Sequence, residues 1–219
     1  MAVASLHVST HPLVLQRLCI LRDVATPPPL FRAAVADLAM LLAIEATADL
    51  PLTETSVTTP MGIARGSALV QRIALVPILR AGLGMVESTL RLLPNAQVWH
   101  LGAYRDHASL QPVMYYNHLP QHPELDLCLV LDPMLATGGS AVAAVDALRS
   151  HGIPQIKFIG LIGAPEGVHT LATAHPDVPI HLAALDEHLT PPPLLADDPP
   201  EGYIVPGLGD AGDRQFGTG

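Results

Sequence analysis

Nine residues, Asp132 to Ser140, have the types and spacing of a phosphate-binding turn. They read Asp-Pro-Met-Leu-Ala-Thr-Gly-Gly-Ser and directly follow the apolar run Leu127–Leu131. A short run that is apolar at every position predicts a buried strand of a parallel sheet. Paired glycines let several backbone N–H groups face one anion, and a helix after the turn would add the positive end of its dipole. The pattern therefore predicts that Asp132 contacts sugar hydroxyls and that Thr137 to Ser140 hold a phosphate.

Two commoner glycine-rich phosphate motifs do not fit this chain. A P-loop needs a lysine within G-x-x-x-x-G-K-[ST], and the only lysine is Lys157. The segment Gly207–Gly212 matches G-x-G-x-x-G, but the sequence stops at Gly219. We expect no room there for the helix and second strand of a dinucleotide-binding unit, so we interpret this match as accidental.

Composition favours one compact α/β domain over residues 1–219. Hydrophobic residues make up 49% of the chain and charged residues 14%, which fits strands that are covered on both faces. The longest wholly apolar run, Leu38–Ile44, is too short to span a bilayer, and the first residues do not resemble a secretion signal. We therefore expect a cytoplasmic protein with no membrane partner.

Charge and cysteine content exclude further classes. The formal net charge of −9 argues against nucleic acid as a partner, because binding to a phosphate backbone depends on clustered lysine and arginine. Two cysteines, Cys19 and Cys128, form no disulfide framework and no zinc signature. We expect Cys128 to be inert packing in a buried strand, and we expect no metal held by protein side chains alone.

From about residue 72 onward, strand and helix patterns alternate, which is typical of βαβ units and a parallel sheet. The predicted strands are Ile73–Leu79, Gln97–Ala103, Leu125–Leu131, Ile156–Ile162 and Val178–Ala184. The predicted helices are Gly84–Leu92, Gly138–His151 and Pro165–His175, with an earlier amphipathic helix at Pro29–Ala48.

Three other segments depart from this alternation. Tyr104–His122 is polar and aromatic with two prolines, and we expect an irregular lid in place of a crossover helix. Leu50–Gly66 is rich in threonine and predicts an extended hairpin arm. Pro191–Pro200 is a proline-rich linker, after which the glycines and Asp210 of Tyr203–Gly219 could bring main-chain groups close to a flat ligand.

Two arginines stand at expected strand ends, Arg80 and Arg105. Arginine favours bidentate contacts with phosphate groups, so both are candidates for a diphosphate contact. The remaining arginines on expected helices are interpreted as ordinary surface residues. They are Arg17, Arg22, Arg32, Arg91 and Arg149.

Several motifs together resemble the uracil phosphoribosyltransferase family of type I phosphoribosyltransferases. Those motifs occur in the family's order and cover nearly the whole chain. They are Glu45–Leu50, Val76–Met85, Tyr104–Arg105, Asp132–Ser140, Ala164–Gly167, Ala174–Val178 and Tyr203–Thr218. The wider superfamily has two adjacent acids at the strand end, whereas uracil-specific members share the proline found here as Pro133.

The resemblance implies a type I phosphoribosyltransferase fold, a mainly parallel sheet flanked by helices. A core over about residues 68–190 would carry a small hood from about residues 1–30 and 191–219, together with a β-arm. The implied reaction joins uracil to 5-phosphoribosyl 1-diphosphate (PRPP), giving UMP and diphosphate in pyrimidine salvage. Mg²⁺ would enter mainly on the diphosphate of PRPP.

The resemblance also assigns roles by position. Arg105, Asp132 and Asp210 would be catalytic, and Ile204, Gly209, Asp210 and Ala211 would bind uracil. The expected PRPP contacts are Arg80, Arg105, Asp132, Pro133, Met134, Leu135, Ala136, Thr137, Gly138, Gly139, Ser140 and Asp210.

Assembly, regulation and the choice of base are less determined by the residues. The resemblance implies a homodimer or homotetramer and GTP as an effector. Two alternatives remain: a phosphoribosyltransferase for another base, which the Tyr203 to Asp213 segment disfavours, and a nucleotide-sensing RNA-binding regulator, which the negative net charge disfavours.

Overall fold

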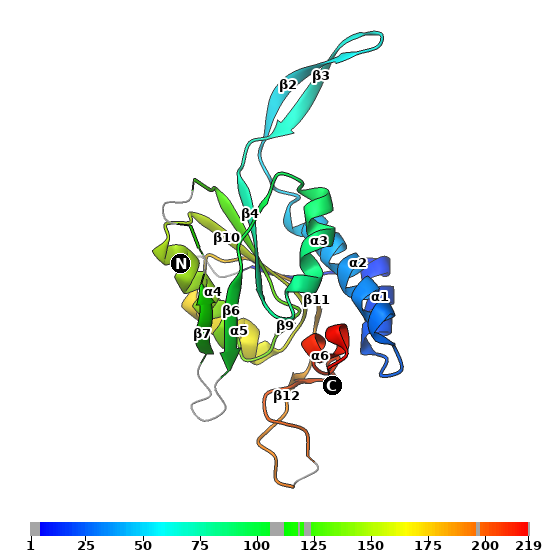
Figure 1. The fold of residues 1–219 in the computed structure, drawn as a ribbon, viewed down its shortest axis with the longest axis vertical. Helices are drawn as coiled ribbons and strands as arrows, with labels where there is room; N and C mark the ends of the chain where they lie inside the picture. Colours follow the sequence, from blue (N-terminus) through cyan, green and yellow to red (C-terminus); the bar gives the residue numbers. More distant parts are fainter. Residues whose placement is uncertain (1–4, 106–111, 118, 121–123, 196–197, 219) are drawn as a thin grey trace.

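A mainly parallel sheet forms the centre of the computed structural model, which describes residues 5–105, 112–117, 119–120, 124–195 and 198–218 (Figure 1). Within those residues, nine strands belong to this sheet. They are β1 (Leu6–Val8), β4 (Ile73–Leu79), β5 (Gln97–Val98), β6 (Leu101–Arg105), β7 (Pro112–Asn117), β8 (Leu127–Leu131), β9 (Met134–Leu135), β10 (Gln155–Gly163) and β11 (Ile180–Leu185). The order is β1-β11-β10-β8-β4-β6-β7, with β5 on β4 and β9 on β10, and the pairs are parallel except β6 with β7. The predicted parallel sheet is thus confirmed.

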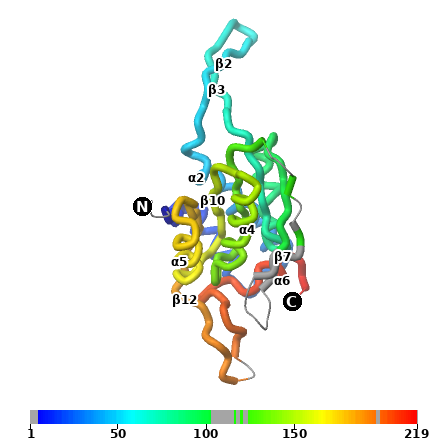
Figure 2. Tube along the Cα trace, turned by 90° about the vertical axis from the view of Figure 1, so that its left-hand side faces the viewer, coloured from blue at the N-terminus to red at the C-terminus, as the bar shows by residue number. Residues whose placement is uncertain are grey.

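Helices cover both faces of the sheet (Figures 1 and 2). One face is packed by α1 (Pro12–Arg22), α2 (Pro28–Ala46), α3 (Leu83–Leu92) and the short C-terminal α6 (Ala211–Phe216), and the other by α4 (Gly139–Ser150) and α5 (Pro165–Ala174). Side chains alternate between the two cores along each strand, as the pleat requires. In β8, Leu129 joins the α2 side while Cys128 and Val130 join the α4 side. Cys128 is fully buried and burial raises the pKa of its thiol to about 12, so its interpretation as inert packing is confirmed.

Helix α2 provides the largest buried stripe on its side of the sheet. Pro28 stands at its start, where a missing N–H costs nothing, and Thr47 ends it by donating its hydroxyl to the Ala43 carbonyl at 2.6 Å. The predicted apolar face is buried as expected, with Phe31, Val35 and Leu38 at 0% exposure. None of the helices in the described part of the chain has the length and apolar content needed to cross a membrane.

Two hairpins lie outside the layered core. The arm consists of β2 (Leu52–Thr59) and β3 (Gly62–Leu69), which pair antiparallel and project from the end of the sheet opposite α6 (Figure 1). The predicted arm is therefore confirmed, with a boundary a few residues later. At the other end, β12 (His188–Leu189) pairs with β13 (Ile204–Val205).

The segment after β6 differs from the prediction. We expected an irregular lid over Tyr104–His122, but residues 112–117 form β7, antiparallel to β6. Its β-branched and aromatic residues fit an edge strand, and Pro112 is tolerated there because it stands first in the strand. The strand predicted at Gln97–Ala103 is also two pieces, since β5 ends at Val98 and the Trp99 N–H donates to the Leu75 carbonyl at 2.9 Å.

Packing of α2 generates a stability prediction. Leu38→Ala removes a fully buried side chain and is expected to lower the free energy of unfolding by about 2–5 kcal/mol. Leu15→Ala on α1 is the control, because Leu15 is half exposed, and it should cost less than about 1 kcal/mol. Urea unfolding at one fixed protein concentration measures both, and equal losses would contradict the assignment of the core.

Candidate active site

The carboxyl ends of the parallel strands meet at one edge of the sheet, and the candidate residues lie there. Arg80 follows β4, Asp132 follows β8, and Arg105 ends β6. In open α/β sheets this edge is where ligands bind. The structure therefore brings the phosphate turn and the first arginine turn together, as predicted.

Backbone hydrogen bonds attach the phosphate turn to β10. The Pro133 carbonyl accepts from the Leu161 and Ile162 N–H groups at 3.0 Å each, and the Leu135 carbonyl accepts from Ala164 at 3.0 Å. Pro133 has no N–H to leave unpaired in this arrangement. The first half of the turn is thus a short strand, β9, rather than a free loop.

Two glycines let the second half of the turn pack against α5. Gly138 has φ of +84°, and a Cβ there would lie 2.8 Å from the Gly167 carbonyl oxygen. A Cβ on Gly167 would lie 2.3 Å from the Ala136 carbonyl oxygen. The Ala164–Gly167 motif therefore serves the phosphate turn by permitting this close approach.

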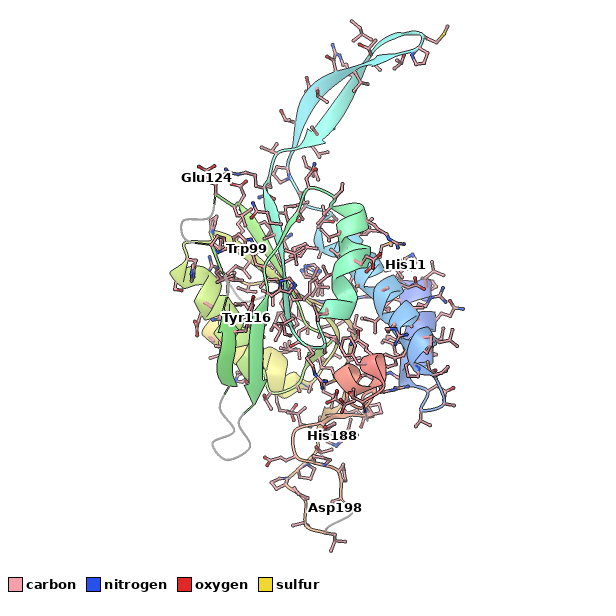
Figure 3. The ribbon with its side chains drawn as sticks, viewed as in Figure 1. His11, Trp99, Tyr116, Glu124, His188 and Asp198 are labelled. Atoms are coloured by element: carbon pink, nitrogen blue, oxygen red, sulfur yellow. The ribbon has the colours of Figure 1, made fainter. Side chains whose placement is uncertain are left out.

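A cavity of about 160 Å³ lies over the turn. It is lined by Asp132, Met134, Leu135, Ala136, Thr137, Gly138, Ser140, Ala141 and Gly202. The N-terminus of α4 begins at Gly139, so its unpaired N–H groups face this space with the positive end of the helix dipole. Gly202 lines the cavity from the loop between β12 and β13. Figure 3 labels two residues of this region, His188 at the start of β12 and Asp198 in the loop. The geometry suits a phosphate group, and the binding of one there remains a prediction.

Asp132 lies at the rim of this cavity, partly buried, with its carboxylate accepting from the Met134 N–H at 3.3 Å. Burial raises the pKa of Asp132 to about 7, while that hydrogen bond acts weakly in the other direction. A carboxylate that is poorly solvated without a ligand gains from accepting hydroxyl hydrogen bonds. This environment fits the expected contact with ribose hydroxyls.

Arg80 lies on a tight turn after β4. The peptide bond Leu79–Arg80 is cis, and a Cβ on Gly82 would lie 2.4 Å from the Leu131 carbonyl oxygen, so the turn is packed against the end of β8. The Arg80 side chain is 57% exposed and its Nη2 donates to Asp213 Oδ1 at 3.1 Å. The guanidinium is therefore accessible to an anion while it contacts the C-terminal segment.

Asp210 caps α6, since its Oδ1 accepts from the Asp213 N–H at 2.9 Å. Burial raises the pKa of Tyr203, and the carboxylates of Asp210 and Asp213 raise it further. The hydrogen bond from the Thr218 hydroxyl, and after it the contact with Arg80, lower the pKa of Asp213, whereas desolvation opposes them. Charged groups of the two predicted segments therefore face one another across the site.

The predicted base-binding residues lie on a glycine-rich turn. Ile204 is buried in β13, while Gly207 and Gly209 have φ of +62° and +76°. A Cβ on Gly207 would lie 2.0 Å from the Ile204 carbonyl oxygen, so only glycine fits there. Ala211 begins the short helix α6 within the G-x-G-x-x-G string, contrary to our expectation of no helix there, and the described residues, which end at 218, contain no second strand after it.

Arg105 is placed by its backbone alone. It ends β6 opposite Pro112 of β7, and its side chain lies outside the described residues. β6 runs parallel to β4 and so toward the same edge as the phosphate turn, whereas β7 starts near that edge and runs away from it (Figure 1). Its expected role in binding diphosphate remains a prediction.

Several side chains that organise the site were missed by the sequence. Arg22 was expected on a helix surface, but it pairs with the buried Asp186, and Arg32 donates to the Gln215 carbonyl at 2.6 Å. Gln215 is fully buried and its Nε2 donates to the carbonyls of Ala81 and Ala211 at 3.1 and 2.9 Å. The interpretation of Arg22 as an ordinary surface residue is therefore wrong, whereas Arg32 is exposed despite its bond to Gln215 and Arg91 is 70% exposed as expected.

Oxygen donors at the site fit a magnesium ion that arrives on a ligand. The described residues contain no group of three or more His, Cys, Asp or Glu side chains that could hold a metal by themselves. Asp132 and Asp210 offer carboxylate oxygens, which are the ligands that Mg²⁺ takes alongside substrate phosphates.

Comparison with known proteins identifies what the chain is similar to. The family model described as "Uracil phosphoribosyltransferase" matches residues 8–218. Uracil phosphoribosyltransferase of Roseiflexus castenholzii is 60% identical over 97% of this chain and 98% of its own length. That of Geobacillus kaustophilus is 50% identical over 99% of this chain and 100% of its own length. The solved structure of the AQ2163 protein from Aquifex aeolicus superposes with a TM-score of 0.88 at 35% identity, covering 97% of this chain and 98% of that one.

The raised pKa of Asp132 generates a prediction on pH. The pKa of Asp132 is about 7 in the folded protein against an ordinary 3.8, so the protonated carboxyl group stabilises the folded state. This contribution to the free energy of unfolding is complete below about pH 4 and is lost as the pH rises to about 7. Asp132→Asn should remove this loss, so the variant gains stability relative to the original protein between those pH values. Urea midpoints without ligands from pH 4 to 8 measure it, with Glu54→Gln on the exposed arm as the control. Parallel profiles for Asp132→Asn and the original protein would contradict the assignment.

Proposed function

The chain belongs to the uracil phosphoribosyltransferase family, and we propose that it joins uracil to PRPP, releasing diphosphate and forming UMP in pyrimidine salvage. The reaction replaces the bond from C1′ of the ribose to the diphosphate oxygen with a bond to a uracil nitrogen, which loses its proton. The observation that carries the proposal is the contact of Arg80 with Asp213, because it joins the arginine turn to the base-binding segment beside the phosphate turn.

Each part of PRPP has a matching set of residues in this proposal. The backbone of Ala136 to Ser140 would hold the 5′-phosphate at the N-terminus of α4, and Asp132 would accept from the ribose hydroxyls. Arg80 and Arg105 would contact the diphosphate. Pro133, Met134 and Leu135 would contribute through the backbone that β9 holds in place.

Electrostatic stabilisation of the leaving group would provide most of the catalysis. Positive charge develops on the ribose and negative charge on the departing diphosphate as the C1′–O bond breaks. The two arginines would stabilise the diphosphate, and Mg²⁺ on PRPP would neutralise further charge when bound. Asp132 and Asp210 would supply the negative groups that face the ribose and the metal, and no protein nucleophile is required.

Uracil would be recognised by backbone groups of the glycine-rich turn. Ile204, Gly209, Asp210 and Ala211 form the proposed base site, where the lack of side chains at Gly209 lets the main chain approach the edge of a planar ring. A site built from such hydrogen bonds rejects a base with a different donor pattern, because its own groups would be left unpaired. Cytosine is the relevant competitor.

Organisation, location and regulation belong to the same proposal. We treat residues 1–219 as one domain, with a core over about 68–190 and a hood from about 1–30 and 191–219. Location in the cytoplasm is proposed because PRPP is highly charged and must be used in the compartment that makes it.

A second copy of the chain is the proposed partner, as a homodimer or homotetramer, because the arm exposes Leu52, Val57 and Ile63 to solvent. GTP is the proposed effector. Light scattering and assays with added GTP address these two points.

A product assay tests the reaction. The pure protein with Mg²⁺ and PRPP should convert uracil to UMP, and should turn over cytosine, orotate and hypoxanthine at least about a hundredfold more slowly. Chromatography of the products after a fixed time separates the four outcomes. Turnover of orotate or hypoxanthine in preference to uracil would overturn the proposed base.

Loss of an arginine tests the proposed diphosphate contacts. Arg105→Ala and Arg80→Ala should each lower turnover by roughly 10- to 1,000-fold, the scale of removing one electrostatic stabiliser. Arg91→Ala removes an exposed arginine on α3 and serves as the matched control, with turnover expected unchanged. Steady-state rates at saturating uracil and PRPP measure the effect, and a normal rate for Arg105→Ala would remove that residue from the diphosphate site.

A further inference from the structure

The C-terminal end of α1 is bonded to the base-binding turn, although the two lie far apart in the sequence. Arg22, the last residue of α1, forms a two-pronged ion pair with Asp186 directly after β11, with Nη2–Oδ1 and Nη1–Oδ2 distances of 2.5 and 2.8 Å. The same Nη1 donates to the Gly207 carbonyl at 2.8 Å. The Gly207 N–H in turn donates to Asp186 Oδ2 at 2.9 Å. Both backbone groups of Gly207 are therefore bound by one ion pair.

A second arginine makes the converse connection, from α6 to the end of α1. Arg214 donates to the carbonyls of Leu21, Asp23 and Leu208, the last at 2.8 Å. Its guanidinium also lies 4.4 Å from the centroid of the Phe31 ring. Helix α6 packs against α2, which directly follows the end of α1 in the chain (Figure 1).

Asp186 is held firmly and is not a solvent-exposed partner. Its side chain is 3% exposed, and its backbone N–H donates to the Gly163 carbonyl at the end of β10 at 2.7 Å. Charge-assisted bonds of this bidentate kind are stronger and more directional than neutral ones, particularly when they are shielded from water. The ion pair therefore fixes the turn relative to the carboxyl edge of the central sheet.

This network determines which backbone groups of the turn remain for the base. The carbonyls of Gly207 and Leu208 are bound to arginines and point into the protein. Base recognition then falls to the groups further along, from Gly209 to Ala211, and their direction depends on the conformation at Gly207. Gly207 has a φ of +62° and no side chain that could hold it, so its conformation is held by the hydrogen bonds of its backbone N–H and C=O groups.

We propose that Arg22 and Asp186 are positioning residues that orient the base-binding turn and thereby set the affinity and selectivity for uracil, without touching it. The inference rests on the proposed function. It predicts a larger effect on the base than on PRPP, since the phosphate turn is bonded to β10 independently of this ion pair and Asp210 is the one residue of the base-binding turn proposed to face PRPP.

Asp186→Asn is the principal test because it keeps the shape of the side chain. The amide has one oxygen where three N–H donors now converge, so the Gly207 N–H or an Arg22 prong loses its acceptor. The KM for uracil should rise by about 10- to 100-fold, the range expected for a lost hydrogen bond to a charged group. Discrimination against cytosine should fall, while kcat at saturating uracil and the Kd for PRPP from titration calorimetry should change less than about twofold.

Matched variants separate positioning from loss of folding. Asp37→Asn breaks the Arg17–Asp37 pair of 2.6 Å, which joins α1 to α2 away from the turn, and should leave both substrates unaffected. Arg22→Lys keeps the charge but not the fork and should raise the KM for uracil by a smaller factor than Asp186→Asn. If Asp186→Asn does not fold, the uracil KM and the PRPP Kd of Arg22→Lys are measured in its place.

The outcomes distinguish this inference from the proposed function. Failure of the original protein to form UMP would overturn the proposed function and the inference with it. Normal activity of the original protein with an unchanged uracil KM in Asp186→Asn and Arg22→Lys would overturn the inference alone. An equal rise in the PRPP Kd would also overturn it, because the ion pair would then support the whole site rather than the base turn.

Discussion

Parallel pairing of β8 with β4 on one side and β10 on the other is the constraint on which the site depends. Val130 of β8 is in register with Val76 of β4 and with Phe158 of β10, so the three strands finish at the same edge. The residues that follow them then have to lie close together, whatever their separation in the chain. The gathering of the candidate site residues at this edge is a consequence of strand direction rather than of any one motif.

In the two turns of the candidate site, some backbone groups are bonded inside the protein and others are left for a ligand. The phosphate turn gives its early carbonyls to β10 and leaves the amides at the start of α4 for a ligand, and the base turn gives two carbonyls to arginines. In both places, the backbone groups bonded inside the protein hold their neighbours along the chain at a fixed orientation. Such prior ordering reduces the conformational entropy that a ligand would have to remove on binding.

Local patterns made most of the fold predictable from the sequence, and distance along the chain limited the rest. The buried strands, the phosphate turn and the arm each have a signature within about ten residues, and each was found. Arg22 and Asp186 are 164 residues apart, and nothing near either one indicates its partner. Gln215 similarly reads as an ordinary helical residue until α6 lies against the Ala81 carbonyl. The edge strand β7 was missed because its one proline, Pro112, and its polar neighbours resemble those of an irregular loop.

The position of the arm has a consequence for how such a protein can diversify. Its interstrand hydrogen bonds run between β2 and β3, and it leaves the sheet at the end where β4 begins, whereas Arg80 follows the end of β4. Changes in its length or surface therefore leave the register of the central strands intact. The arm and the carboxyl ends of the parallel strands lie at opposite ends of the sheet, so the surface of the arm can change while the residues at the other end stay constant.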